Sequence, residues 1–97
     1  MYTRFAMFTL NEGKRETAKE IMGRFENAMK DLRGYKGSTY IADDQIGEYG
    51  VLSLWETAQD AKHADTVLAT DFYKALFRRT KYAPIRRILE VFEPQNG

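Results

Sequence analysis

Residues 49–57 read Tyr49-Gly50-Val51-Leu52-Ser53-Leu54-Trp55-Glu56-Thr57, and this stretch decides the fold because it joins a strand directly to a helix. Both alternating faces of the segment 48–55 are largely apolar, so we expect a strand that is covered on both sides. Thr57 is a favoured helix N-cap residue, and Asp60 three positions later resembles a capping box. The stretch therefore predicts a strand over 48–55 followed at once by a helix.

Three segments upstream of this junction also have clear patterns. Residues 2–10 are rich in aromatic and apolar residues, with Arg4 as the only charge, which is typical of a strand covered on both sides. Residues 35–42 favour a second strand, and the turn residues that follow predict a hairpin with 48–55. Between them, a helix is expected over 14–33, and Gly34 is expected to end it by adopting the left-handed backbone conformation. Its apolar stripe falls at positions 18, 21, 22, 25, 28, 29 and 32.

Downstream of the junction, a stripe of Ala61, Ala64 and Leu68 continues the second helix. Thr70 and Asp71 together form a second capping signal, which predicts a kink near 70 and a further helical segment over 72–79. Pro84 ends any helix, and residues 85–92 favour a last strand before the polar tail 93–97. A basic cluster surrounds the last loop and is expected to be solvated at the rim of the protein. It consists of Arg78, Arg79, Lys81, Arg86 and Arg87.

The order β-α-β-β-α-β predicts an α+β, ferredoxin-like fold in which a four-stranded antiparallel sheet carries both helices on one face. The whole chain, 1–97, is expected to form a single domain. The other face of the sheet would be apolar, and 43% of the residues are hydrophobic, a high fraction for 97 residues. We therefore predict a homodimer in which two such open faces pack together.

Composition narrows the class of protein further. The 15 basic and 14 acidic residues leave a net charge of +1, which argues against nucleic acid as a partner. The absence of cysteine excludes disulfides and thiolate metal sites. No apolar run approaches the roughly 20 residues of a membrane helix, so we expect a cytoplasmic protein that does not contact a membrane. The chain has one histidine and no cluster of carboxylates at the spacing of metal ligands, so we expect no metal site.

The chain resembles the dimeric α+β barrel superfamily and, within it, the antibiotic biosynthesis monooxygenase (ABM) domain family. The resemblance covers almost the whole chain and is carried by residues 32–37 (LRGYKG), 53–57 (SLWET) and 71–75 (DFYKA). It implies an ABM-like domain that forms a dimeric α+β barrel, with a cleft between helices and sheet that takes small aromatic ligands. It also implies a monooxygenase that uses O₂ without any cofactor to oxidise a small hydroxylated aromatic or quinol.

The resemblance also implies which residues line the cleft, while the acid–base chemistry of single side chains indicates which could act on the substrate. The expected substrate-binding residues are Phe25, Ser53, Trp55, Phe72 and Tyr73. Candidates for the chemistry itself are Tyr40, Tyr73 and His63. Each has a structural interpretation as well. Trp55 could fill the core beneath the helix, the tyrosines could be half-buried with wet hydroxyls, and His63 could lie on the solvent side of its helix.

The sequence is also compatible with other functions. Haem-degrading relatives use an Asn in the first strand and an iron-ligating His further along the second helix, and neither matches this chain, although Trp55 matches their tryptophan. The same fold could serve a small-ligand sensor or carrier without catalysis, because the sequence offers no convincing acid–base pair. The carboxylates of the first predicted helix are interpreted as members of exposed ion pairs, Glu20 with Arg24 and Glu26 with Lys30. Isomerase or decyclising chemistry would need a buried carboxylate, for which Glu56 is the one candidate.

Overall fold

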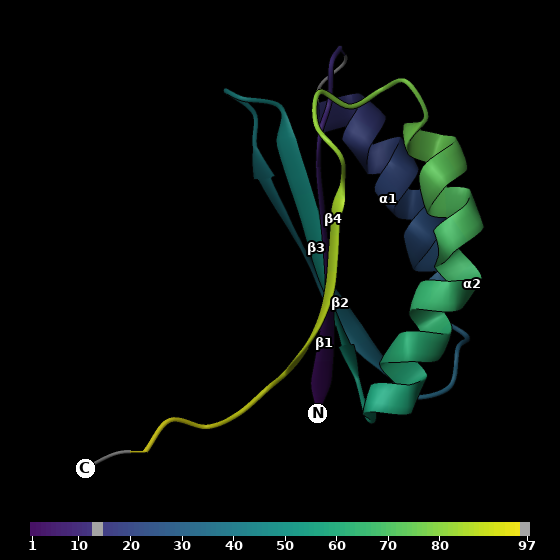
Figure 1. Cartoon of the computed structure of the whole chain (residues 1–97), viewed down its shortest axis with the longest axis vertical. Helices are drawn as coiled ribbons and strands as arrows, with labels where there is room; N and C mark the ends of the chain where they lie inside the picture. The colour runs from purple at the N-terminus through teal and green to yellow at the C-terminus, as the bar shows by residue number, and fades with distance from the viewer. Residues whose placement is uncertain (13–14, 96–97) are drawn as a thin grey trace.

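The computed structural model describes residues 1–12 and 15–95, which form a four-stranded antiparallel sheet with both helices on one face (Figure 1). The strand order is β2-β3-β1-β4. This confirms the predicted α+β, ferredoxin-like arrangement. The elements are β1 (Tyr2–Thr9), α1 (Arg15–Met29), β2 (Tyr35–Asp43), β3 (Glu48–Trp55), α2 (Ala58–Leu76) and β4 (Ile85–Glu90).

The first helix is shorter than its sequence pattern predicts. It ends at Met29 and not at Arg33, and successive turns carry the chain over 30–34 into β2. The expected start at Lys14 lies outside the described residues. Gly34 does adopt the left-handed conformation, with φ of 82°, and a Cβ atom there would lie 2.2 Å from the Asp60 carboxylate. Glycine is therefore needed both for the turn and for the close approach to α2.

The second helix starts as predicted but does not kink. Thr57 caps it, since its hydroxyl accepts a hydrogen bond from the Asp60 backbone N–H at 3.0 Å. The helix then runs without a break to Leu76, so the expected kink near 70 and the segment up to Arg79 are wrong. The buried stripe continues from Leu68 to Phe72. Packing of that stripe on the sheet outweighs the local capping preference of Thr70 and Asp71.

The two faces of the sheet have different surroundings. The face toward the helices is the core, where Ala6, Phe8 and Val51 are at most 2% exposed. The opposite face carries no helix (Figure 1) and remains apolar, with Ile85 49% exposed and Leu89 40% exposed. Among the described residues, no helix has the length and apolarity needed to cross a membrane.

Candidate functional site

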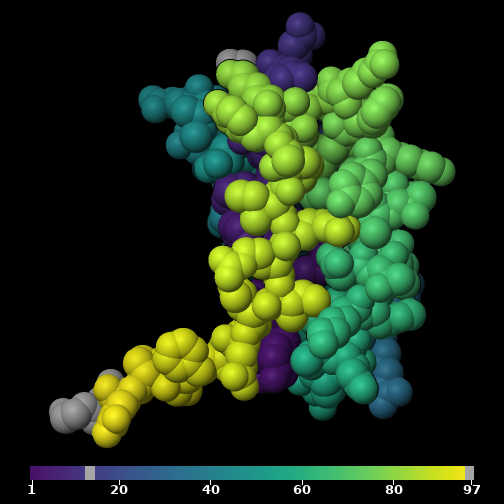
Figure 2. All heavy atoms as spheres, in the orientation of Figure 1, coloured from purple at the N-terminus to yellow at the C-terminus, as the bar shows by residue number. Residues whose placement is uncertain are grey.

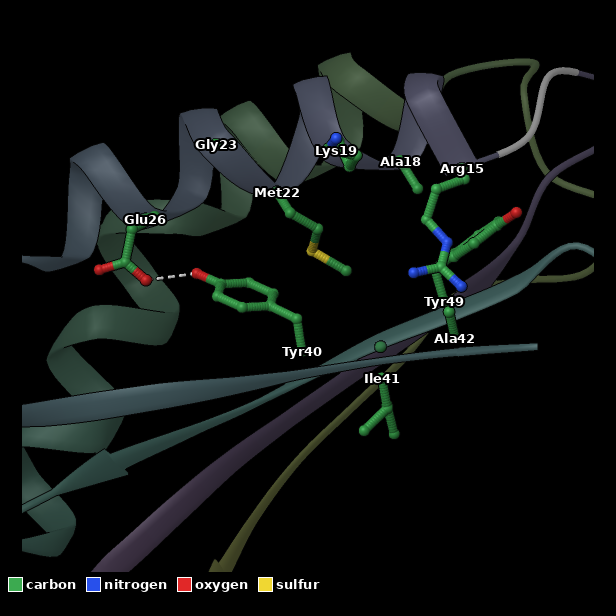
Figure 3. A pocket seen from close by; sticks show the side chains of 11 residues that line it. Arg15, Ala18, Lys19, Met22, Gly23, Glu26, Tyr40, Ile41, Ala42 and Tyr49 are labelled. Atoms are coloured by element: carbon green, nitrogen blue, oxygen red, sulfur yellow. Dashed lines mark hydrogen bonds between the residues drawn. The ribbon is translucent and has the colours of Figure 1, made fainter. Parts of the chain in front are cut away.

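A cavity of about 470 Å³ opens between α1 and the strands β2 and β3 (Figure 3). Its size falls in the range of small-molecule sites. Gly23 helps to keep it open, because a Cβ atom at that position would meet no heavy atom within 4 Å. The lining residues are Arg15, Ala18, Lys19, Met22, Gly23, Glu26, Tyr40, Ile41, Ala42, Tyr49 and Gly50.

One end of the cavity is a carboxylate that accepts hydrogen bonds from two phenols. Glu26 on α1 accepts from the Tyr40 hydroxyl (Figure 3) and, at 2.8 and 3.0 Å, from the Tyr35 hydroxyl. The Ser38 hydroxyl lies 2.7 Å from that of Tyr35, which extends the network along β2. A register shift between Tyr35 and Ser38, with Gly37 at φ of 118°, permits this local geometry.

The same contacts correct the sequence interpretation of Glu26. The helical spacing had placed it in an exposed pair with Lys30, whereas its partners are the tyrosines of β2. Burial raises the pKa of Tyr40 well above its usual range, and the hydrogen bond to Glu26 raises it further. Burial likewise raises the pKa of Tyr35. Both phenols therefore stay protonated at neutral pH and act as donors to the Glu26 carboxylate.

The other end of the cavity is an ion pair. Arg15 binds Asp44 through two contacts of 2.7 and 3.2 Å, and the Tyr49 hydroxyl donates to the same carboxylate at 2.9 Å. The hydrogen bond to Asp44 raises the pKa of Arg15. Between the two ends the walls are mostly apolar, with Ala18 and Met22 from α1 facing β2, although Lys19 also lines the cavity. The cavity thus offers an apolar middle between two polar ends.

Of the residues expected to bind substrate, all but Tyr73 lie elsewhere, within the packed core. The Trp55 indole is 0% exposed and donates to the Ser53 hydroxyl at 2.9 Å. Ser53 in turn donates to the Arg4 carbonyl oxygen at 3.2 Å. The rings of Phe25 and Phe72 stack with centroids 5.4 Å apart. These residues gather between the helices and the sheet as expected, but they pack against one another and do not border the open cavity.

The three residues considered for chemistry have separate positions. Tyr40 lines the cavity, while Tyr73 is 58% exposed on α2 and His63 is exposed on the same helix. Glu26 was missed as a site residue, although it directly follows the buried Phe25 and therefore borders the apolar stripe. Among the described residues, no group of three or more His, Asp or Glu side chains could hold a metal ion.

No protein-family model matches the chain, and no curated protein matches it in sequence. Solved structures match its fold closely. A mutant of SnoaB, a cofactor-independent oxygenase from Streptomyces nogalater, has a TM-score of 0.77 and 14% identity, covering 96% of this chain and 94% of that one. A candidate antibiotic biosynthesis monooxygenase from Nitrosomonas europaea has a TM-score of 0.76 and 12% identity, covering 98% and 93%.

A third structure, a candidate antibiotic biosynthesis monooxygenase from Caulobacter crescentus CB15, has a TM-score of 0.74 and 17% identity, covering 95% of this chain and 90% of that one. Sequence identity this low establishes shared architecture and not shared chemistry. The resemblance noted from the sequence is therefore confirmed at the level of the fold: this chain has the fold of the antibiotic biosynthesis monooxygenase structures.

Proposed function

We propose that this protein is a cofactor-independent monooxygenase that oxidises a small hydroxylated aromatic or quinol with O₂ in the cavity between α1 and the sheet. The observation that carries the proposal is the Glu26–Tyr40 pair at the end of an apolar cavity of about 470 Å³. A carboxylate beside a phenol is suited to bind a substrate hydroxyl and accept its proton. The fold adds support, because SnoaB, a cofactor-independent oxygenase, shares it.

The chemistry needs little from the protein beyond binding and proton removal. A hydroquinone hydroxyl at Glu26 would give its proton to the carboxylate, and the electron-rich anion would pass one electron to O₂. The resulting semiquinone and superoxide would combine into a ring peroxide anion, which takes the proton back from Glu26 and then loses water to give a hydroxyquinone. One oxygen atom enters the product, the other leaves as water, and the substrate supplies all four electrons. The apolar walls keep bulk water from the anion.

Oxygen consumption tests this proposal directly. A panel of simple hydroquinones and hydroxylated polycyclic aromatics should include at least one that consumes O₂ well above the protein-free rate. With ¹⁸O₂, the product should carry one labelled oxygen atom per turnover. A panel in which no compound exceeds the protein-free rate would contradict the proposal.

Gly23 provides a test of whether the cavity is the place of reaction. A helix-interior glycine costs about 0.5–1 kcal/mol relative to alanine, so Gly23→Ala should raise the free energy of unfolding by about that amount. Gly23→Leu should fill the space that now lacks a side chain and lower kcat/KM for the best quinol by at least about tenfold. Urea denaturation and steady-state kinetics measure the two effects. Full activity in a folded Gly23→Leu variant would place the reaction elsewhere.

A non-catalytic binding protein is the second candidate function. The observation that favours it is that Tyr35 and Tyr40 both already donate to Glu26, which occupies the group assigned as the base. Native mass spectrometry of protein taken directly from cells would then show a retained small ligand that is released chemically unchanged. A ligand that is converted on exposure to air would rule this function out.

We also propose that a second copy of the chain covers the open face of the sheet. Phe5, Met7, Leu52 and Leu54 point to this face, and burying several hundred Å² of it would favour association by several kcal/mol at about 25 cal/mol per Å². Analytical ultracentrifugation at micromolar concentration should show a dimer. Leu52→Asp should shift the sedimentation to the monomer, whereas Gln59→Asp on the exposed side of α2 should not. A stable wild-type monomer would disprove the dimer.

A further inference from the structure

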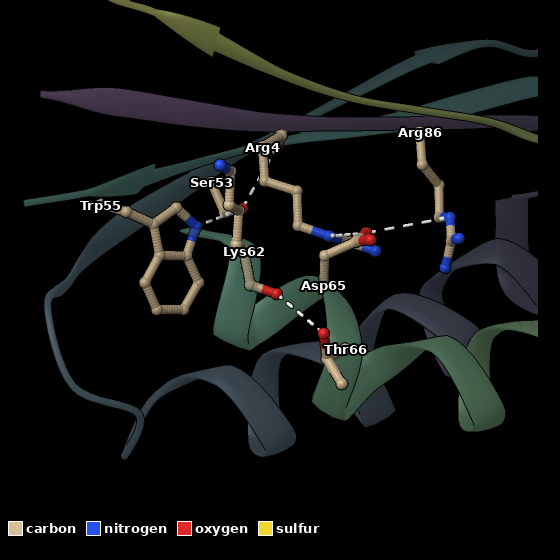
Figure 4. Close-up of polar contacts among 7 residues, drawn as sticks. All are labelled: Arg4, Ser53, Trp55, Lys62, Asp65, Thr66 and Arg86. Atoms are coloured by element: carbon tan, nitrogen blue, oxygen red, sulfur yellow. Dashed lines mark hydrogen bonds and ion pairs between the residues drawn. The ribbon is translucent and has the colours of Figure 1, made fainter. Parts of the chain in front are cut away.

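Three charged side chains meet between α2 and the sheet, and none of them lines the cavity under α1. Arg4 from β1 and Arg86 from β4 both reach toward Asp65 on α2 (Figure 4). The Arg4 Nε donates to Asp65 Oδ1 at 2.9 Å, and the Arg86 Nε lies 3.8 Å from the same oxygen. The sequence had placed Arg86 among solvated rim arginines, but its side chain is only 22% exposed and Arg4 is 1% exposed.

The cluster has more positive charge than its own residues neutralise. Two guanidinium groups share one carboxylate, and arginine keeps its proton at neutral pH even where, as for Arg4, burial lowers its pKa. Within the described part of the chain, Arg4 Nη2 and Arg86 Nη1 are both buried without a hydrogen-bond partner. Buried polar groups in native proteins nearly always have a partner. A water molecule would satisfy the N–H groups, whereas an anion would satisfy both the N–H groups and the charge.

Aromatic rings hold the two guanidinium groups in place. The guanidinium carbons of Arg4 and Arg86 lie 5.9 and 5.7 Å from the centre of the Phe72 ring. Arg86 also lies 5.0 Å from the centre of the Tyr73 ring. These cation–π contacts use the positive charge of the two guanidinium groups without occupying Arg4 Nη2 or Arg86 Nη1, which remain available as donors. The unpartnered donors are one Nη group on each arginine, and a carboxylate has two oxygens, so each arginine can donate to one of them.

The cluster can be reached from outside along the seam between α2 and β4. The side chains of Asp65 and Arg86 are 29% and 22% exposed to solvent, whereas that of Arg4 is buried. In the space-filling view, β4 runs beside α2, and atoms of β1 are visible between them (Figure 2). A small anion would enter at Arg86, and the side chains along this seam would have to separate to admit it, because Arg4 Nη2 and Arg86 Nη1 are buried.

We propose that the Arg4–Asp65–Arg86 cluster is a binding site for a small monocarboxylate, held by the free N–H edges of the two arginines. The bound carboxylate pairs with Arg4 Nη2 and Arg86 Nη1 and brings the cluster to zero net charge. The site is independent of the proposed quinol chemistry, because it lies under α2 and not under α1.

Sodium acetate and sodium chloride, compared at equal sodium concentration, test the site in the whole protein. Acetate titrated to saturation should raise the midpoint of thermal unfolding by about 5 °C over chloride. Arg86→Met, which keeps a long side chain without the charge, should lose this difference. Arg24→Met, which alters an exposed arginine of α1, should keep it.

A second measurement does not depend on how stable a variant is. The ¹⁹F resonance of trifluoroacetate should broaden in the presence of the wild-type protein and sharpen again when acetate is added. Broadening that persists in Arg86→Met would overturn the proposal. Equal thermal midpoints in acetate and chloride would also overturn it, and would indicate that water satisfies the buried N–H groups.

Discussion

Replacing Glu26 with Gln should lower kcat for quinol oxidation by about 10²–10⁴-fold, the usual contribution of a general base. The amide is nearly isosteric with the carboxylate, but it cannot accept a proton from a substrate hydroxyl. It can also accept a phenol hydrogen bond only through its one oxygen, so the contacts from Tyr35 and Tyr40 cannot both remain as they are. Steady-state oxygen uptake measures the change.

Two controls separate this loss from simple unfolding. Glu20→Gln, on the exposed side of α1, should leave the rate unchanged. Ultraviolet titration of the tyrosines should show a lower pKa for Tyr40 in Glu26→Gln, because the hydrogen bond to the carboxylate is one of the causes that raise it, although burial is the larger. A folded Glu26→Gln variant that keeps more than about a tenth of the wild-type rate would remove Glu26 from the mechanism.

Replacing Asp65 with Asn should lower the free energy of unfolding by about 3 kcal/mol, the lower end of what breaking a buried ion pair costs. Arg4 is 1% exposed and would keep its charge without a counter-ion. The lower end applies because the Asp65 side chain is itself 29% exposed to solvent. Urea denaturation measures the loss, with Asp71→Asn on the same helix as a control that should change the stability by less than about 0.5 kcal/mol.

The double change of Arg4→Met with Asp65→Leu sharpens this test. Removing Arg4 together with Asp65 leaves only the partly exposed Arg86 without its carboxylate, whereas removing Asp65 alone also strands the fully buried Arg4, so the double variant should be more stable than Asp65→Leu alone. Urea denaturation of the wild type, Arg4→Met, Asp65→Leu and the double variant gives the coupling energy between the two positions. A coupling energy close to zero would mean that the 2.9 Å contact between Arg4 and Asp65 contributes nothing to stability.

Local patterns predicted most of the fold. β3 has the predicted bounds, 48–55, because alternation of buried side chains and the Thr57 cap mark both of its ends. Most of the predicted stripe, positions 18, 21, 22, 25 and 29, is buried on α1, while Ala28 and Leu32 are only partly buried and Leu32 lies beyond the end of the helix. The errors occur where a local signal competes with packing: Thr70 and Asp71 resemble a cap, but burial of Leu68 and Phe72 on one stripe carries α2 through them.

The candidate site was harder to predict because its contacts join distant segments. Arg4 shares a strand face with Ala6, so alternation alone could have placed it toward the helices. Its meeting with Asp65, however, depends on the register that sets Ala6 opposite Arg86 and on the rotation of α2 about its axis. Similarly, the pairing of Glu26 with Tyr40 depends on how α1 crosses β2. No short stretch of sequence encodes either arrangement.

The strand order has a consequence for how the chain acquires its structure. β1 is hydrogen-bonded on one side to β3 and on the other to β4, which is the last element in the chain. During synthesis, β1 leaves the ribosome before either neighbour, with two unpaired edges and apolar side chains on both faces. Unpaired strands of this kind readily join other chains. Nascent molecules of this protein should therefore depend on chaperones until β4 has been made, whatever the stability of the finished fold.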